Sequence, residues 1–180
     1  MKTLETERLL LRPWSIDDKK DHYEYAKSKV VGPMAGWKPH DSIEESEKII
    51  QMFIKEDETW AIVCKENGKV IGSVGLHNDG KRDLGSDKAR MLGYVLSEEF
   101  WGQGIMTEAC KRVMRFAFED MNLEILSVCH YPFNIKSKRV IEKLGFHYEG
   151  QLRKATTIYD GTVYDDLCYS ILREEYEQEK

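Results

Sequence analysis

The sequence predicts an α+β fold with a mixed β-sheet, in a single domain over residues 1–180. Two β-rich runs flank Asn67-Gly68, a strong signal for a hairpin of antiparallel strands. Between residues 89 and 130 a strand pattern, a helical pattern and a second strand pattern follow one another, which predicts a parallel pair joined by a right-handed crossover. A length of 180 residues with 41% hydrophobic side chains suits one core. The expected order is β α α β β β α β α β β.

The N-terminal segment predicts a strand followed by a helix. Residues Arg8–Trp14 have the pattern of a strand, which Pro13 brings to an end. Ser15 and Asp18 have the spacing of a capping box, in which each side chain accepts a hydrogen bond from the other residue's backbone N–H. We therefore expect a helix over residues 17–28.

The next segment predicts a loop and then a second helix. Residues 31–40 hold two glycines and two prolines and are expected to form a loop. Ser42 and Glu45 repeat the capping-box spacing at the start of a helix over residues 43–57. Four apolar residues recur there at helical spacing, namely Ile49, Ile50, Phe53 and Ile54.

The middle of the chain predicts three strands and a helix. The hairpin spans residues 59–76, a turn follows at Asp79-Gly80, and residues 89–97 form the next strand. A helix is expected over residues 104–120. Its inward-facing residues would be Ile105, Ala109, Val113, Phe116 and Ala117.

The last third predicts a strand, a helix and a hairpin. Residues 123–130 form a short apolar strand, and a helix follows from its cap Asn134 to a C-terminal stop at Gly145. Its inward-facing residues would be Val140, Ile141 and Leu144. Strands over 147–154 and 162–172, joined by an Asp-Gly turn at 160–161, complete the order, and the charged end after them is expected to be solvated.

Composition and charge exclude several classes of protein. The net charge of −5 disfavours a general nucleic-acid binder. No apolar run approaches the roughly 20 residues that a membrane-spanning helix needs, and the N-terminus has no apolar core of a secretory signal. We expect a cytoplasmic protein that binds neither nucleic acid nor a membrane.

The four cysteines predict no special chemistry. Cys64, Cys110, Cys129 and Cys168 form no C-x-x-C pair, and no His/Cys cluster has the spacing of a zinc site. Three of them lie in apolar runs, which favours buried, reduced thiols. No metal is therefore expected.

The strongest local feature is a pair of glycines where a strand runs into a helix. Gly102 and Gly104 leave the backbone bare at a helix start, where several N–H groups have no intrahelical partner and the helix dipole is positive. This pattern predicts a phosphate or diphosphate cradle made of main-chain amides from Gly102 to Thr107. A tight strand–helix turn without a ligand would explain the glycines equally well. The chain has no P-loop, and Thr107 occupies the third glycine position of a dinucleotide fingerprint.

Four stretches resemble the GCN5-related N-acetyltransferase (GNAT) superfamily. "FWGQGIMTEA" resembles the cofactor loop of its ribosomal-protein-alanine (RimJ/RimL-like) branch. "TERLLLRPW", "ENGKVIGSVGL" and "NIKSKRVIEKLGFHYEG" resemble the same branch, in the same order along the chain. The general loop pattern is [Q/R]-x-x-G-x-[G/A], and here Trp101 and Met106 depart from it at the two ends.

The resemblance implies a GNAT fold and acetyl-CoA as co-substrate. The family's fourth and fifth strands splay apart, and the pantetheine arm would lie along Tyr94, Val95 and Leu96. The diphosphate would lie on the loop, whose residues are Trp101, Gly102, Gln103, Gly104, Ile105, Met106 and Thr107. Met106 must then turn its side chain away from the diphosphate.

The resemblance also implies roles at the helix that begins near Asn134. Asn134 would contact CoA, and Ser137 would lie near the sulfur and return a proton to the thiolate. A plain N-cap and an ordinary first-turn serine would explain the same two residues. Tyr94 and Tyr131 are alternative hydroxyl donors.

The general base stays open among Glu108, His130 and His77. Glu108 lies in the first turn of the cradle helix, where the dipole favours a carboxylate in any case. Each histidine ends a strand, and a lone histidine is more often a hydrogen-bonded structural residue.

The acceptor would be a primary amine of a protein N-terminus or a small molecule, attacking the thioester directly in a ternary complex. Trp37 and His130 are the candidate acceptor-binding residues, and a homodimer is possible. Two alternatives remain: an acetyl-CoA-binding sensor or interaction module without turnover, and a different phosphate-bearing ligand in the same cradle.

Overall fold

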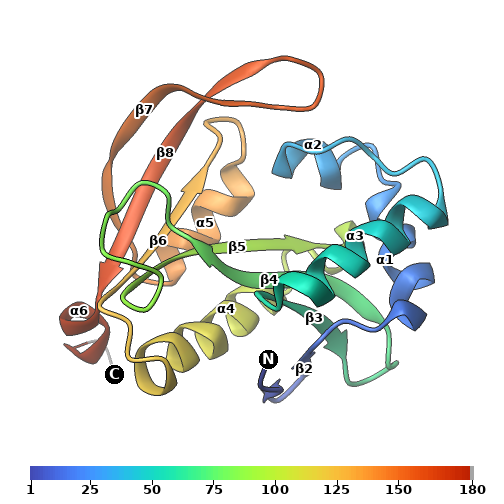
Figure 1. Ribbon diagram of the computed structural model, residues 1–180, viewed down its shortest axis with the longest axis horizontal. Coiled ribbons are helices and arrows are strands. Elements are labelled where there is room, and N and C mark those ends of the chain that lie inside the picture. Colours follow the sequence, from blue (N-terminus) through green and yellow to red (C-terminus); the bar gives the residue numbers. More distant parts are fainter. Residues whose placement is uncertain (179–180) are drawn as a thin grey trace. The chain divides into compact units, whose positions relative to one another are not determined.

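The computed structural model describes residues 1–178 and confirms an α+β fold with a mixed sheet (Figure 1). Within these residues eight strands form one sheet in the order β1-β2-β3-β4-β5-β6-β8-β7. The strands are β1 (Leu4–Glu5), β2 (Leu9–Arg12), β3 (Thr59–Cys64), β4 (Val70–Asn78), β5 (Ala89–Leu96), β6 (Ile125–His130), β7 (His147–Thr157) and β8 (Val163–Leu172). The helices are α1 (Lys19–Ala26), α2 (Val31–Ala35), α3 (Ile43–Glu56), α4 (Ile105–Arg115), α5 (Ile135–Lys143) and α6 (Arg173–Gln178).

The chain folds into two compact units, which we describe one at a time. The first unit comprises Met1–Gly75 and Tyr94–Arg112, and the second comprises Leu76–Gly93 and the chain from Val113 onward. β4 and β5 each run from one unit into the other.

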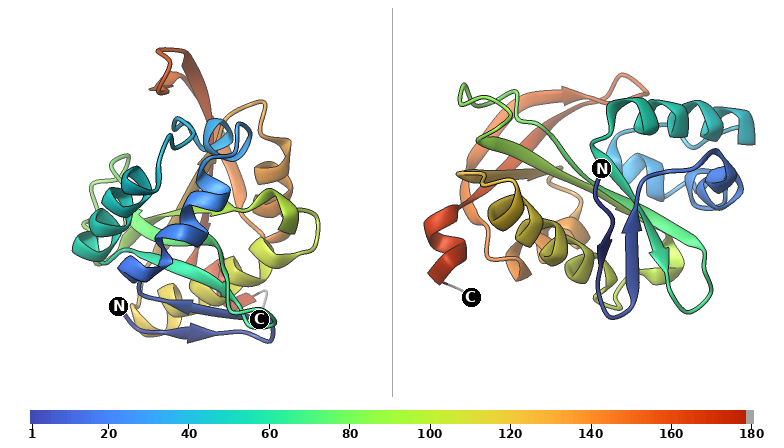
Figure 2. Two further views of the ribbon diagram at one scale, coloured as in Figure 1. Left: turned by 90° about the vertical axis from the view of Figure 1, so that its right-hand side faces the viewer. Right: turned by 60° about the horizontal axis from the view of Figure 1, so that its bottom comes forward.

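The first unit contains the antiparallel strands β1, β2, β3 and the start of β4. β2 pairs with β3 from Leu9 opposite Cys64 to Arg12 opposite Ala61. Figure 2 shows the N-terminal hairpin of β1 and β2, in dark blue, beside β3. The predicted hairpin of β3 and β4 is confirmed, and Gly68 in its turn adopts a positive φ of 72°.

The core of the first unit lies between its strands and the helices α1 and α3. The capping box of Ser15 and Asp18 is confirmed, although a 3₁₀ turn over Ile16–Asp18 precedes α1. The Ser42 side chain caps α3 as predicted, by accepting a hydrogen bond from the Glu45 backbone N–H. The buried apolar cluster consists of Trp14, Tyr25, Ala26, Val31, Ile50, Ala61, Val63 and Val70.

The second unit contains the parallel pair and the long C-terminal hairpin. β5 pairs with β6 in parallel from Ala89 opposite Ile125 to Met91 opposite Ser127, as the strand–helix–strand pattern predicted. β6 pairs with β8 antiparallel over its whole length, and β7 with β8 forms the long hairpin in orange and red in Figure 1. The predicted cap of α5 is confirmed, because the Asn134 side chain accepts a hydrogen bond from the Ser137 backbone N–H.

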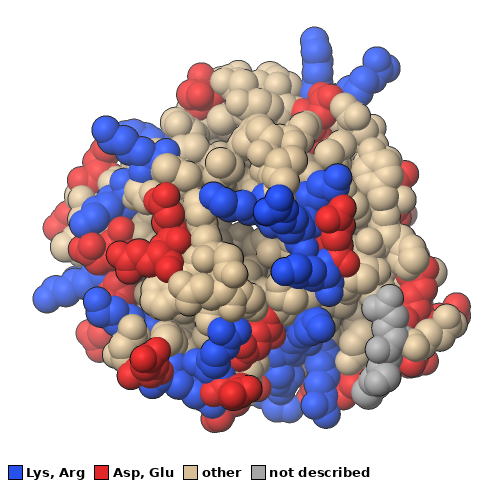
Figure 3. Space-filling model, turned by 180° about the vertical axis from the view of Figure 1, so that it is seen from behind, with Lys and Arg blue, Asp and Glu red and all other residues tan. Residues whose placement is uncertain are grey.

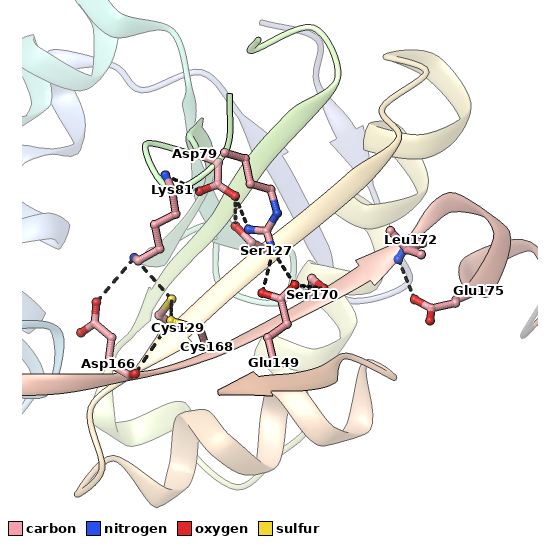
Figure 4. Close-up of polar contacts among 11 residues, drawn as sticks. Asp79, Lys81, Ser127, Cys129, Glu149, Asp166, Cys168, Ser170, Leu172 and Glu175 are labelled. Carbon is pink, nitrogen blue, oxygen red and sulfur yellow. Dashed lines mark hydrogen bonds and ion pairs between the residues drawn. The ribbon is translucent and has the colours of Figure 1, made fainter. Parts of the chain in front are cut away.

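A network of polar side chains, buried at Asp79 and Ser127 and exposed at Glu149, ties the loop after β4 to three strands of this unit (Figure 4). Asp79 accepts hydrogen bonds from Ser127 Oγ at 2.6 Å and from Arg82 Nη1 at 2.7 Å. Arg82 Nη2 lies 2.6 Å from both carboxylate oxygens of Glu149, and Ser170 Oγ donates to Glu149 at 2.9 Å. The buried carboxylate of Asp79 is therefore paired with the Arg82 guanidinium, and the network holds the loop on the sheet.

Two segments expected to lack regular structure are helical. Residues 31–35 form α2 rather than a loop, because Pro33 lies in its first turn, where it needs no backbone N–H bond, and Gly36 ends it at a φ of 88°. The charged end forms α6 over Arg173–Gln178, and the two residues after it lie outside the described part.

Two further expectations differ in detail. The first strand is shorter than Arg8–Trp14, and β1 precedes it. The cradle helix changes from α to π geometry over Phe116–Asp120, so Phe118 is buried at 1% exposure, whereas Phe116 is only partly buried. A π segment has more residues per turn, which moves the buried position along the chain.

The surface carries both signs of charge. Acidic and basic side chains are interspersed over the face shown in Figure 3. Exposed ion pairs such as Lys88 with Glu124, at 2.9 Å, contribute little to stability. Among residues 1–178 no helix has the length and apolar character to cross a membrane.

Candidate active site

The glycine pair at the start of α4 has the backbone geometry of a bare-amide turn. Gly102 and Gly104 both have a φ of 76°, in the left-handed region that glycine adopts without strain. A Cβ on Gly102 would meet nothing within 4 Å, and one on Gly104 would meet only Arg8 Nη2, at 3.8 Å. The backbone conformation therefore favours glycine at both positions. The space that a side chain would occupy at either position is open within this unit.

The residues of the turn are exposed, whereas the first two residues of α4 are buried. Gly102, Gln103 and Gly104 are exposed, whereas Ile105 and Met106 are buried at 4% and 6% exposure. Met106 thus turns its side chain into the core, as acetyl-CoA binding at this loop would require. What the turn presents to solvent is mainly backbone, together with the N–H groups of the first helical turn, which have no intrahelical partner.

Two side chains of the loop brace its shape. Trp101 Nε1 donates a hydrogen bond to the Leu96 carbonyl at 2.9 Å, and Gln103 Nε2 donates to the Glu99 carbonyl at 2.8 Å. Both bonds close the turn between the end of β5 and the start of α4. Trp101 therefore supports the loop from behind, where a polar Gln or Arg stands in the general family pattern.

Glu108 is held by the N-terminal hairpin. Its carboxylate accepts from Thr6 Oγ1 at 2.6 Å, from the Arg8 backbone N–H at 3.1 Å and from Arg8 Nε at 2.7 Å. Partial burial raises the pKa of Glu108, but these hydrogen bonds and the Arg8 charge outweigh it and leave the pKa below its ordinary value. A carboxylate bound in this way is a weak proton acceptor, so its surroundings favour a positioning role over that of a general base.

Arg8 extends the same contact to the cradle itself. Its Nη1 donates to the Gln103 carbonyl at 3.1 Å, so one guanidinium binds both Glu108 and the loop between the two glycines. Sequence reasoning missed Arg8 and Thr6 as site residues. Their stretch carried the family resemblance, but no local pattern pairs them with a glutamate 100 residues away.

Val95, Leu96 and Trp37 are placed by packing. Val95 and Trp37 are partly buried against the apolar cluster of the first unit, and Leu96 is buried at 8% exposure. A Cβ on Gly32 would lie 2.6 Å from the Trp37 ring, so the glycine makes room for that ring. Tyr94 is partly buried next to Val95 on the same strand.

In the second unit, Asn134 and Ser137 lie together at the start of α5. Asn134 Oδ1 accepts the Ser137 backbone N–H at 3.0 Å, and both residues are partly buried. The capping bond uses the backbone of Ser137, so its hydroxyl is not the group that holds the cap.

His130 is a buried, hydrogen-bonded residue of β6. Its Nδ1 lies 2.8 Å from the Tyr131 carbonyl and its Nε2 lies 3.2 Å from the Tyr169 hydroxyl, at 5% exposure. A carbonyl can only accept, so Nδ1 carries a proton, and in the neutral imidazole Nε2 accepts from Tyr169. These contacts favour a structural role for His130 over acceptor binding or proton abstraction.

Two of the thiols, those of Cys110 and Cys129, are poor nucleophiles for acyl transfer. Burial raises the pKa of Cys110 well above its ordinary range and, together with Cys168, raises the pKa of Cys129 to about 12. Among residues 1–178 no three His, Cys, Asp or Glu side chains come together as metal ligands.

The structure brings the predicted residues together in two sets. In the first unit, the cradle residues 101–107 adjoin Val95, Leu96 and Glu108. In the second unit, Asn134 and Ser137 form the start of α5, and His130 lies on β6 against Tyr169.

Comparison with known proteins identifies the class. Residues 8–147 match the model of the acetyltransferase (GNAT) domain, and the chain belongs to the GNAT family of N-acetyltransferases. It is 37% identical over 114 residues to a Bacillus subtilis protein named "Putative ribosomal N-acetyltransferase YdaF". That match covers 63% of this chain and 60% of the relative.

Solved structures agree with the fold and with the predicted branch. A GNAT-family acetyltransferase from Bacillus anthracis has a TM-score of 0.86 at 21% identity, and the match covers 97% of this chain and all of that one. The ribosomal-protein-S5-alanine acetyltransferase from Vibrio fischeri has a TM-score of 0.76 at 25% identity, over 98% of this chain and 99% of that one. The resemblance to the RimJ/RimL-like branch is thereby confirmed.

Proposed function

We propose that residues 1–180 act as one domain that transfers the acetyl group of acetyl-CoA to a primary amine, by direct attack in a ternary complex. The amine belongs to a protein N-terminus or a small molecule. The observation that carries this proposal is the exposed glycine turn at the start of α4, with Gly102 and Gly104 both at a φ of 76°.

The backbone amides of residues 102–107 bind the diphosphate in this proposal. A helix N-terminus favours an anion through its N–H groups and its dipole. The buried side chains of Ile105 and Met106 keep the approach clear, and Arg8 holds the loop through the Gln103 carbonyl. Trp101 keeps the turn closed against Leu96.

When bound, acetyl-CoA supplies an acetyl group activated as a thioester. The main chain of Tyr94, Val95 and Leu96 positions the acyl end, and a backbone N–H there is worth roughly 10²–10³ in rate if it donates to the developing oxyanion. Positioning two bound reactants supplies much of the remaining gain. Asn134 contacts the cofactor from the start of α5.

Proton transfer is assigned to Ser137, whose hydroxyl returns a proton to the leaving thiolate. The tyrosine hydroxyls of Tyr94 and Tyr131 are the alternative donors. Because Glu108 is ion-paired and His130 is hydrogen-bonded on both ring nitrogens, we assign neither as general base, and the substrate ammonium loses its proton to water.

The acceptor assignment rests on the relatives named for ribosomal proteins, with Trp37 as a wall of the acceptor site. A homodimer is part of the proposal, and light scattering of the purified protein tests it.

Thiol release tests the proposal as a whole. The purified protein is mixed with acetyl-CoA and a panel of peptides with N-terminal alanine or serine and of small amines, and free CoA is measured. We expect acceptor-dependent release of CoA by at least one class of amine. Binding of CoA by calorimetry without release across the panel would support the binding-module alternative, and tighter binding of ATP or NAD than of CoA would refute the cradle assignment.

A further inference from the structure

Two cysteines face each other across a strand pair of the second unit. β6 and β8 are antiparallel, and Cys129 lies directly opposite Cys168 in their register. Directly opposed residues in such a pair have Cα atoms about 4.5 or 5.5 Å apart, inside the range of roughly 4.4–6.8 Å that a disulfide needs. The two Sγ atoms lie 3.0 Å apart, and Figure 4 shows them side by side.

A cation lies against this pair. Lys81 Nζ is 3.6 Å from Cys129 Sγ and 3.5 Å from the Asp166 carboxylate, so it lies between a thiol and an acid (Figure 4). Cys168 is buried at 7% exposure, and Cys129 is more exposed. Cys129 is therefore the sulfur that a small reagent reaches first, and a thiolate formed there has the ammonium of Lys81 beside it.

Neither Cys64 nor Cys110 lies opposite another cysteine in a strand pair. Cys64 lies opposite Leu9 in the β2–β3 register, and Cys110 lies on α4 with its side chain wholly buried. They serve as internal controls for the reactivity of the opposed pair.

We propose that Cys129 and Cys168 are a redox-active dithiol, which a low-molecular-weight disulfide converts into a cross-strand disulfide between β6 and β8. The Cys129 thiolate attacks one sulfur of the reagent, forms a mixed disulfide and releases one small thiol. Cys168 then attacks Cys129 Sγ and releases the second. The two protein S–H bonds and the reagent's S–S bond are replaced by one protein S–S bond and two small thiols, so hydrogens and electrons balance.

The surroundings set the rate and the stability of this reaction. Since burial and the neighbouring thiol raise the pKa of Cys129 to about 12, the first attack is slow at neutral pH and accelerates as the pH rises. The second step needs little movement, because the sulfurs are already 3.0 Å apart. Reduction of the closed disulfide starts at Cys129, because Cys168 is the more buried of the two sulfurs.

Oxidised glutathione is the probe that tests the proposal. The reduced wild-type protein is incubated with it at mildly alkaline pH, quenched with acid, denatured and alkylated, and its intact mass and peptide map are measured. We expect the loss of two hydrogens, two alkylated cysteines of the four, and a peptide pair linking Cys129 to Cys168. The variant Cys64→Ser/Cys110→Ser should give the same link, Cys129→Ser should give none, and Lys81→Met should slow the reaction without changing its end point.

Circular dichroism establishes that each protein is folded before oxidation. Four alkylated cysteines in folded wild-type protein after prolonged incubation would overturn the proposal. So would a glutathione adduct on Cys129 that persists, or a link involving Cys64 or Cys110. Because the wild-type peptide map alone decides the outcome, a variant that fails to fold leaves the test intact.

Discussion

Arg8 and Glu108 form a two-point ion pair between the N-terminal hairpin and the first turn of α4. Arg8 Nε donates to Glu108 Oε2 at 2.7 Å and Arg8 Nη2 lies 2.6 Å from the same oxygen. The remaining guanidinium nitrogen, Nη1, donates to the Gln103 carbonyl at 3.1 Å. The planar guanidinium thus fixes the start of the helix relative to the glycine turn, which a flexible lysine would do less well.

Arg8→Met should weaken cofactor binding more than it slows turnover. Without the charge-assisted hydrogen bond from Arg8, the amides of the loop are less ordered before the cofactor binds. We therefore expect the Kd for CoA to rise roughly three- to tenfold, which corresponds to a loss of binding free energy of up to about 1.4 kcal/mol. Calorimetry gives the Kd, and steady-state kinetics gives kcat. Arg115→Met is the matched control, because Arg115 is an arginine whose ion pair is with Glu119 instead of the cradle. Equal CoA affinity in Arg8→Met and wild type would contradict the role of Arg8.

Gly104→Val should abolish CoA binding, because a side chain at this position covers the amides and strains a backbone at a φ of 76°. Gly68→Val is the matched control. Gly68 has a φ of 72° with nothing within 4 Å of an added Cβ, but it lies in the β3–β4 turn. Both variants should lose similar stability, about 1–2 kcal/mol in urea unfolding, since valine resists the left-handed region. If both bind CoA as wild type does, the cradle lies elsewhere.

Ser137→Ala should lower kcat by roughly 10²-fold while leaving CoA affinity close to wild type, as expected for loss of a general acid. The helix cap survives the change, because Asn134 Oδ1 binds the backbone N–H of residue 137. Stopped-flow detection of thiol release separates this effect from product dissociation. An unchanged kcat would transfer the role to Tyr94 or Tyr131, whose phenylalanine variants are tested in parallel.

Stability should fall between pH 7 and pH 5 because of His22. Burial, and then the nearby His40, lower the pKa of His22 from its ordinary 6.5 to about 3. The folded state therefore binds the proton more weakly than the unfolded chain does. Above about pH 6.5 His22 is neutral in both states and costs no stability. As the pH falls below 6.5, protonation of His22 in the unfolded chain lowers the free energy of unfolding, by about 2 kcal/mol at pH 5.

The variant His22→Phe isolates this contribution. His22 packs among aromatic rings, with Trp14 at 5.2 Å and Tyr25 at 5.0 Å between ring centroids, so phenylalanine suits the site. Urea unfolding at several pH values should show a flatter dependence in the variant than in wild type. Parallel curves for the two proteins would show that His22 does not titrate on unfolding.

The elements with strong local signals were predictable. The Asn67-Gly68 turn and the helix start after Gly104 depend on a left-handed backbone that glycine adopts easily, and the cap of α5 depends on the side chain of Asn134. In each case the residue type reveals the element. The glycine pair located the bare-amide turn for the same reason. The helix α2 was missed because its five residues include a glycine and a proline, and its stability comes from packing and from the Gly36 stop.

The roles of the polar residues were harder to predict. From the sequence alone, Glu108 and His130 were reasonable candidates for the general base. Their hydrogen-bond partners, Arg8 and Thr6 for Glu108 and Tyr169 for His130, lie far away along the chain. The surroundings of a side chain set its pKa and therefore how readily it accepts a proton. The neighbouring residues in the sequence do not reveal those surroundings.

By itself the sequence determined the fold class, the family and the place of the bare-amide turn, since each follows from residue types in fixed order. Only the tertiary structure decided that Glu108 is held by Arg8 and that Cys129 faces Cys168. Those relationships depend on strand register and on contacts between distant segments. The distance between two side chains and their burial are set only when the chain folds.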